Sequence, residues 1–172
     1  LAALTRPIVV DVGTGSGCIA LSLASENDTA EIHATESSRP ALRVARANAR
    51  RLGLQRRVTF HLGDLLAPVV SLAPRVDLVV SNPPYVDPAE RASLAPEVLH
   101  YEPTTALFAQ EPFPGVYQRL ARGAARVLRP GGTLLVESGR GQEAAVRGAL
   151  TRGGLDVTET RRDLQGIPRV IV

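Results

Sequence analysis

The sequence predicts an α/β fold in which a mostly parallel, seven-stranded sheet carries an antiparallel hairpin at one edge. Two observations support this prediction. Short apolar, β-branched runs alternate with helical patterns, as in parallel sheets covered by helices on both faces. The end of the chain instead holds two strand-like runs joined by a short connection, which predicts a hairpin. The 172 residues, 44% apolar and 3% aromatic, indicate one domain with a core of Leu, Val, Ala and Ile.

The parallel strands are predicted where the apolar runs occur, at Ile8–Val12, Glu31–Thr35, Val58–Leu62, Val76–Ser81 and Thr133–Glu137. Helical patterns follow them, at Gly17–Ser25, Arg39–Leu52, Val116–Leu128 and Gln142–Arg152. The sequence "RPGG" at 129–132 predicts a helix stop followed by a turn. The hairpin is expected to pair residues 155–163 with residues 168–172, with "LQGI" in the connection and Asp163 and Arg169 tying it together.

The composition excludes several kinds of protein. No apolar run approaches the roughly 20 residues of a membrane span, so we expect a cytoplasmic protein without membrane contact. The one cysteine, Cys18, excludes an internal disulfide and a multi-cysteine zinc site, and we expect it to be small and buried. His33, His61 and His100 show no metal-ligand spacing, and single core or surface histidines are expected.

The basic residues, all 20 of them arginines, give the chain a net charge of +3. Many fall between residues 43 and 57, where Arg43, Arg46 and Arg50 recur at helical spacing. A solvated helix face explains this pattern most simply, while weak contact with an acidic partner such as RNA stays open.

A glycine-rich segment, "DVGTGSG" at residues 11–17, begins in the last two residues of the first predicted strand and leads into a helix. Gly13, Gly15 and Gly17 permit a tight turn that a ligand can approach without meeting a Cβ atom. Glu36 ends the next strand, where an acidic residue can accept hydrogen bonds from ribose hydroxyls, and Asp64 follows the third strand. The spacing is not that of the dinucleotide fingerprint and the chain has no lysine for a P-loop, so another nucleoside cofactor is predicted.

A second motif, "SNPPY", follows the fourth strand at residues 81–85 and opens a segment rich in proline. Residues 83–114 hold seven of the thirteen prolines and no clear periodicity, which is typical of a functional loop or of disorder. Because the segment begins at this motif, we interpret it as a loop on the substrate side.

Together the two motifs resemble those of class I S-adenosylmethionine-dependent methyltransferases, and more narrowly the amine-methylating branch with an (N/D)PP(Y/F/W) motif. The resemblance implies a Rossmann-like fold, S-adenosyl-L-methionine as cofactor, S-adenosyl-L-homocysteine as product, and no metal. It also implies a set of cofactor-binding residues: Asp11, Gly13, Thr14, Gly15, Gly17, Glu36, Asp64, Leu65 and Asn82.

The "NPPY" residues suit methyl transfer to a planar nitrogen, whose lone pair is delocalised. Two acceptors, the Asn82 side-chain carbonyl and the Pro83 backbone carbonyl, would orient the two N–H bonds of an NH2 group. The prolines at 83 and 84 hold the preceding residues extended, which fixes these acceptors. Tyr85 offers a face on which the amide or base can stack. We therefore expect Asn82, Pro83 and Tyr85 to be catalytic and, with Pro84, to bind substrate.

Two further segments resemble the HemK/PrmC family, which methylates the glutamine of the GGQ motif in peptide-chain release factors. They are "LAPEVLHYEPTTALFA", with Tyr101 and Glu102, and the closing "RRDLQGIPRVIV". The resemblance implies N5-methylation of that glutamine, with a release factor as partner. We expect residues 1–172 to be the catalytic domain, without the family's N-terminal helical domain, and to be a monomer. The segment "AQEPFPGV" stands where the family has "GGxDGL"; it keeps Gly115 but not the aspartate of that pattern, which puts the local loop shape and its substrate contacts in doubt.

Two alternatives stay open from the sequence. One is an N-methyltransferase acting on an exocyclic amine of a base in RNA or DNA, which the arginine-rich helix favours. The other, from a different class, is a module that binds S-adenosyl-L-methionine without catalysis.

Overall fold

The computed structural model describes residues 5–86, 108 and 111–172. The strands form a seven-stranded sheet in the order β3-β2-β1-β4-β5-β7-β6. The chain divides into two compact units, Leu1–Ser81 with Gly123–Leu135, and Asn82–Arg122 with Val136–Val172. The predicted fold class, a mostly parallel sheet with an antiparallel C-terminal hairpin, is confirmed.

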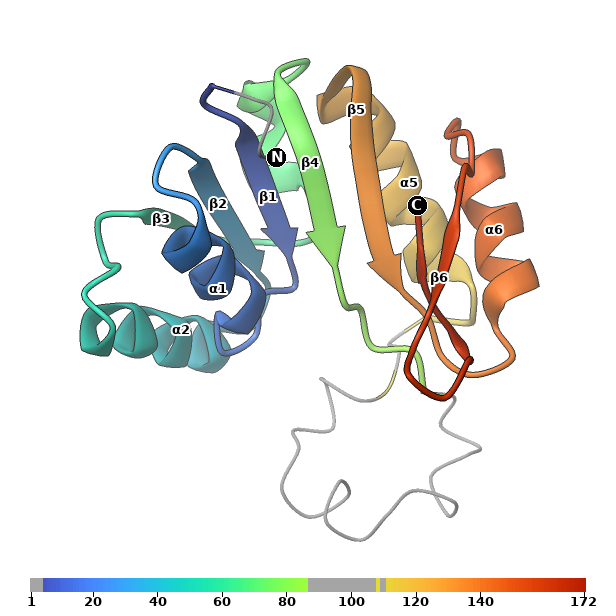
Figure 1. Cartoon of the computed structure of the whole chain (residues 1–172), viewed down its shortest axis with the longest axis horizontal. Coiled ribbons are helices and arrows are strands. Elements are labelled where there is room, and N and C mark those ends of the chain that lie inside the picture. Colours follow the sequence, from blue (N-terminus) through green and yellow to red (C-terminus); the bar gives the residue numbers. More distant parts are fainter. Residues whose placement is uncertain (1–4, 87–107, 109–110) are drawn as a thin grey trace, which may run out of the picture. The chain divides into compact units, whose positions relative to one another are not determined.

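The first unit alternates strands and helices as predicted (Figure 1). In chain order they are β1 (Ile8–Val12), α1 (Cys18–Glu26), β2 (Glu31–Glu36), α2 (Arg39–Arg51), β3 (Val58–Leu62), a 3-10 helix η1 (Ala67–Leu72) and β4 (Val76–Ser81). Helix η1 was not predicted. β1 pairs in parallel with β2 and with β4, and β2 pairs in parallel with β3. Figure 1 shows the arrowheads of β1 and β4 at the same edge of the sheet.

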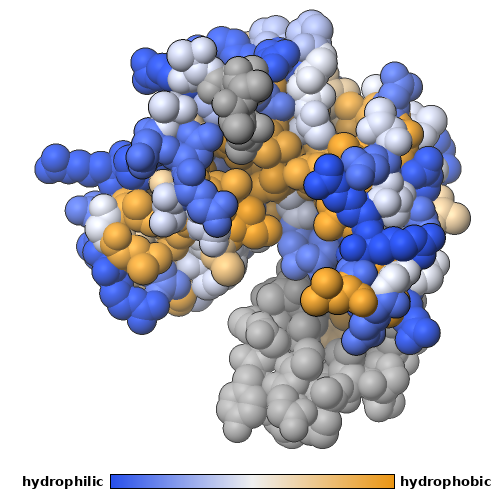
Figure 2. Space-filling model, viewed as in Figure 1, coloured by the Kyte–Doolittle hydropathy of each residue, from blue (hydrophilic) through white to orange (hydrophobic). Residues whose placement is uncertain are grey.

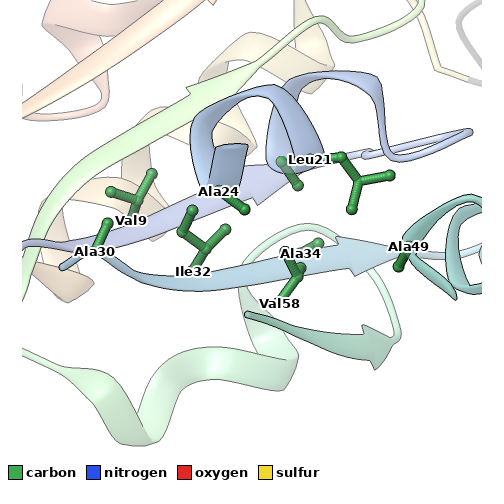
Figure 3. Close-up of a cluster of buried hydrophobic side chains, with 9 residues drawn as sticks. Val9, Leu21, Ala24, Ala30, Ile32, Ala34, Ala49 and Val58 are labelled. Carbon is green, nitrogen blue, oxygen red and sulfur yellow. The ribbon is translucent and has the colours of Figure 1, made fainter. Parts of the chain in front are cut away.

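The core of this unit is aliphatic, as the composition predicts. Its main cluster, drawn in Figure 3, joins β1, β2 and β3 to helices α1 and α2. It consists of Val9, Ala20, Leu21, Ala24, Ala30, Ile32, Ala34, Ala49 and Val58. Because side chains alternate along a strand, His33 and Thr35 point to the other face of β2, and both are buried as well. Both faces of β2 are therefore covered.

Helix α2 begins where its sequence predicts. The Ser38 hydroxyl accepts a hydrogen bond from the Ala41 N–H at 3.3 Å, and Pro40 lies in the first turn. Serine at the N-cap and proline in the first turn both favour a helix start, because the first N–H groups have no intrahelical acceptors. The helix ends at Arg51, and Gly53, just beyond the C-cap Leu52, has a left-handed φ of +71°.

The remaining elements are α5 (Gly115–Val127), β5 (Leu128–Glu137), α6 (Glu143–Arg152), β6 (Thr160–Arg162) and β7 (Pro168–Ile171). The prediction for residues 129–132 was partly wrong, because β5 begins at Leu128 and takes in the predicted turn. Gly131 within it has a φ of +74°, which glycine adopts freely.

The C-terminal hairpin of the second unit is antiparallel, as predicted. β7 pairs with β6 and with the end of β5, where Glu137 lies opposite Val170. The Asp163 carboxylate accepts hydrogen bonds from the N–H groups of Gln165 and Ile167, and its other oxygen pairs with Arg169 Nε at 3.0 Å. The prediction that Asp163 and Arg169 tie the hairpin together is confirmed.

Candidate functional site

The glycine-rich loop after β1 is fixed by the end of β2. The N–H groups of Gly13 and Thr14 both donate to the backbone oxygen of Thr35, at 2.9 and 3.0 Å. Gly13 and Gly15 have φ angles of +70° and +56°, and a Cβ added to either would meet no atom within 4 Å. The backbone here is thus left-handed and its Cβ positions are open, as a loop that a ligand approaches closely requires.

Gly17 serves helix packing instead. Its φ is +87°, and a Cβ would lie 3.1 Å from Leu21 Cδ1 and 3.3 Å from Ala45 Cβ. Asn48 of α2 also donates to the Ser16 backbone oxygen at 2.9 Å. Helices α1 and α2 therefore both support the loop.

Asp11 is the buried acid beneath this loop, with 1% of its surface exposed. Its Oδ2 accepts hydrogen bonds from Thr14 Oγ1 at 2.6 Å and from the Ala20 N–H at 3.0 Å. Burial raises the pKa of Asp11 to about 6, although the two hydrogen bonds act in the other direction. Its Oδ1 is buried without a hydrogen-bond partner among the described residues. A buried acceptor left unpaired is costly, so a donor supplied by a bound molecule fits this position.

Glu36, at the end of β2, accepts backbone hydrogen bonds from the glycine-rich loop and from the start of α2. Oε2 accepts a hydrogen bond from the Gly15 N–H at 2.9 Å, and Oε1 accepts one from the Ser38 N–H at 2.8 Å. Oε1 also accepts a hydrogen bond from Ser37 Oγ at 3.4 Å, whereas Oε2 keeps a further lone pair that can accept from a ligand hydroxyl.

The segment after β3 reaches the same edge of the sheet. Glu36 pairs with Leu62 in the parallel register, and the Gly63 N–H donates to the Glu36 backbone oxygen at 2.9 Å. Asp64 is exposed there, and Leu65 has a φ of +45°, the only positive φ of a non-glycine among the described residues. Such strain is costly for a leucine and concentrates at functional sites. The structure thus brings Asp11, the glycine-rich loop, Glu36 and residues 63–65 to one edge.

The "NPPY" motif begins directly after β4. Asn82 is exposed, Pro83 is buried, and Pro84 and Tyr85 are half-buried. The Tyr85 hydroxyl donates to Glu137 Oε1 at 3.2 Å, and its backbone oxygen accepts from Gln142 Nε2 at 2.8 Å. Burial, followed by the charge of Glu137 and the bond to it, raises the pKa of the Tyr85 hydroxyl, which therefore remains a donor.

Glu137 and Gln142 were not predicted as site residues. Their only signal in the sequence is that Glu137 ends a strand and Gln142 starts a helix, which is common to many structural residues. They lie 52 and 57 residues from Tyr85, so spacing alone does not reveal the contact.

Two expectations about other residues were wrong. Cys18 is exposed rather than buried. His33 and His61 are not single, because His33 Nδ1 lies 3.0 Å from His61 Nε2 and the rings stack. The parallel register places His61 of β3 beside Thr35 of β2, which lies two residues beyond His33 on the same face of the sheet. The contact between the two histidines therefore depends on how β2 and β3 pair.

Other expectations fall outside the described residues or remain predictions. His100, Tyr101, Glu102 and most of the 83–114 loop lie outside the described ranges. Within residues 5–86, 108 and 111–172, no three His, Cys, Asp or Glu side chains gather as a metal site. The same residues include no helix long and apolar enough to cross a bilayer.

Comparison with known proteins identifies the kind of domain. A family model described as "Methyltransferase domain" matches residues 7–162. The release factor glutamine methyltransferase of Cereibacter sphaeroides is 44% identical over 99% of the chain, and that of Rhodospirillum rubrum is 42% identical over 95%. The chain spans 61% and 50% of the lengths of these two relatives.

Solved structures agree on the fold. TrmN from Thermus thermophilus superposes with a TM-score of 0.68 at 26% identity, over 96% of the chain and 43% of that protein. The ribosomal protein L11 methylase of Lactobacillus delbrueckii subsp. bulgaricus also gives 0.68, at 21% identity, over 99% of the chain and 72% of that protein.

Proposed function

We propose that this chain, which belongs to the methyltransferase-domain family, methylates the N5 nitrogen of the GGQ glutamine in peptide-chain release factors, using S-adenosyl-L-methionine. Two relatives more than 40% identical over nearly the whole chain carry the name of that activity. One structural observation carries the chemistry: the "NPPY" motif starts one residue after Ser81, which pairs with Val12, the residue before the glycine-rich loop.

The cofactor half of the proposal rests mainly on residues of the first unit. When bound, S-adenosyl-L-methionine supplies an electrophilic methyl group on a sulfonium centre. Asp11 would accept from its ammonium group through the unpaired Oδ1, and Glu36 would accept from its ribose hydroxyls. Gly13, Thr14, Gly15 and Gly17 would give the backbone approach, with Asp64, Leu65 and Asn82 as further contacts. The unpaired oxygen and the open Cβ positions of Gly13 and Gly15 fit such a ligand.

The amine half of the proposal rests on residues 82–85. Asn82 Oδ1 and the Pro83 carbonyl would accept the two N–H bonds of the glutamine amide and turn its nitrogen toward the methyl group. Tyr85 would stack against the planar amide. Held in this way, the amide nitrogen would be aligned to accept the methyl group that the cofactor would supply, and its proton would pass to water.

The test uses the purified chain, tritiated S-adenosyl-L-methionine and a bacterial release factor, with mass spectrometry of the labelled protein. One methyl group on the GGQ glutamine is expected. Asn82→Ala should lower kcat by roughly 100-fold, because a misoriented amide loses the alignment that transfer requires. Gln165→Ala, an exposed change in the same unit, is the matched control and should keep full activity. An unaffected kcat in Asn82→Ala would overturn the proposed clamp.

A second candidate, methylation of a base amine in RNA or DNA, is favoured by the surface of α2. Five arginines of this helix are exposed, Arg39, Arg43, Arg46, Arg50 and Arg51, and the helix contains no acidic residue. Figure 2 shows hydrophilic residues over the region where Figure 1 draws α2, with hydrophobic ones between them. Val44 of α2 and its C-cap residue Leu52 are 50% and 57% exposed.

A change of substrate separates the two candidate functions. Ribosomal RNA replaces the release factor in the same assay, and an Arg43→Glu/Arg46→Glu variant is compared with the unchanged chain. Label in RNA that falls steeply with added salt and with the double change would favour the second candidate, since phosphate contacts release counterions. Cofactor binding without label in either substrate would instead indicate a non-catalytic module.

A further inference from the structure

Tyr85 is held at three separate points, all from the corner between β5 and α6. Its hydroxyl donates to Glu137 Oε1 at 3.2 Å, and its backbone oxygen accepts from Gln142 Nε2 at 2.8 Å. Its ring lies on Gly139, where an added Cβ would be 3.0 Å from Tyr85 Cδ2. Two of these contacts act on the side chain and one on the backbone.

Gln142 joins two parts of this arrangement with one side-chain amide. Its Oε1 accepts from the Gly139 N–H at 3.0 Å while its Nε2 donates to Tyr85. Both ends of the amide are thus satisfied, which fixes its rotamer and the distance between Gly139 and the Tyr85 carbonyl. A shorter or apolar side chain at 142 would leave the Tyr85 backbone oxygen without this donor.

Glu137 is itself fixed through its backbone. The Tyr117 hydroxyl donates to its backbone oxygen at 3.1 Å, and the strand register pairs it with Val170 of β7. Asp163 and Arg169 lock the hairpin that contains β7, with an Nε–Oδ2 distance of 3.0 Å. The Tyr85 hydroxyl is therefore tied to a carboxylate on a supported strand.

We propose that Glu137 and Gln142 are positioning residues that set the orientation of the Tyr85 ring and the course of the "NPPY" backbone. This inference rests on the proposed function, in which the tyrosine ring stacks against the amide being methylated. The ring must be held before substrate arrives, because a stacking surface that rotates freely pays an ordering cost in every turnover.

The first experiment needs no substrate. The chain has three tyrosines, so 13C-labelled tyrosine gives few ring signals, and Tyr85→Phe identifies that of Tyr85. Relaxation of this signal is compared among the unchanged chain, Glu137→Ala, Gln142→Ala and the control Gln165→Ala. Larger ring motion in the first two variants, with the control unchanged, supports the inference. Equal ring motion in all four proteins would overturn it, whether or not the chain methylates release factors.

The second experiment uses methyl transfer. Gln142→Ala and Glu137→Ala should each lower kcat about tenfold while the Kd for S-adenosyl-L-methionine stays unchanged. In a Tyr85→Phe background, where the hydroxyl is gone, Glu137→Ala should add almost no further loss. A merely structural Glu137 would give a full additive loss in that background. Glu137→Gln, which keeps an acceptor, should recover most of the activity.

Discussion

The Ser81 hydroxyl donates a 2.9 Å hydrogen bond to the backbone oxygen of Val12, and both residues are buried. The two residues are also register partners at the carboxyl ends of β4 and β1. The glycine-rich loop and the "NPPY" motif each begin one residue beyond this pair. The bond therefore fixes the two strand ends from which both proposed binding motifs start.

Ser81→Ala should lower the free energy of unfolding by about 1 kcal/mol, because the Val12 oxygen loses a buried donor. Ser138→Ala is the matched control, since its Oγ is buried without a partner among the described residues. That change should be neutral or slightly stabilising. Urea unfolding of both variants measures the contrast, and an equal loss in the two would contradict the assigned role of Ser81.

Gly17→Ala should destabilise the chain more than Gly53→Ala. Both glycines are left-handed, with φ of +87° and +71°, so each change costs about 1–2 kcal/mol of backbone strain. Only at Gly17 does the new Cβ meet neighbours, at 3.1 Å from Leu21 Cδ1, whereas at Gly53 the space is open. Thermal unfolding compares them, and a lower Tm for Gly53→Ala would refute this assignment of packing strain.

Asp11→Asn should stabilise the free protein and weaken cofactor binding. The pKa of Asp11 is raised by burial from 3.8 to about 6, so the folded state holds the proton more tightly. The contribution of Asp11 to the free energy of unfolding is therefore fully present below pH 3.8 and is lost as the pH rises through about 6. At pH 7 the neutral amide should regain up to about 3 kcal/mol.

The loss of binding has a separate cause. An amide lacks the negative charge that the ammonium group of the cofactor would meet, so the Kd for S-adenosyl-L-methionine should rise at least tenfold. Denaturation at pH 5 and 7.5, with calorimetric titration of the cofactor, measures both effects. Unchanged affinity together with unchanged stability would remove Asp11 from the proposed site.

His61→Gln should reduce the loss of stability on mild acidification. Burial, followed by the neighbouring His33, lowers the pKa of His61 below 6.5. The folded state then binds fewer protons than the unfolded state, so stability falls as pH drops from 6.5 through the lowered pKa. The difference in unfolding free energy between the variant and the unchanged chain, measured from pH 7.5 to 5, isolates this group from Asp11. Parallel pH curves would show that the histidine contact has no such effect.

Much of the fold was predictable because its signals are local. The strands that end at Val12, Leu62 and Ser81 have apolar runs followed within two residues by glycine or proline, and the structure ends them at these residues. Helix α2 has its serine cap and proline in consecutive positions. The 3-10 helix at Ala67–Leu72 was missed, because a short helix lacks the repeated apolar spacing that marks a longer one.

By itself, the sequence determined which residues follow each strand, and therefore that Gly13, Glu36 and Asn82 lie at strand ends. The alternation of apolar and polar residues and the turn residues that follow it mark each strand end within a few positions of the chain. Only the tertiary structure decided which distant side chains meet, such as His33 with His61 and Tyr85 with Glu137. Those contacts depend on strand register and on the packing of segments 28 and 52 residues apart, which no local pattern encodes.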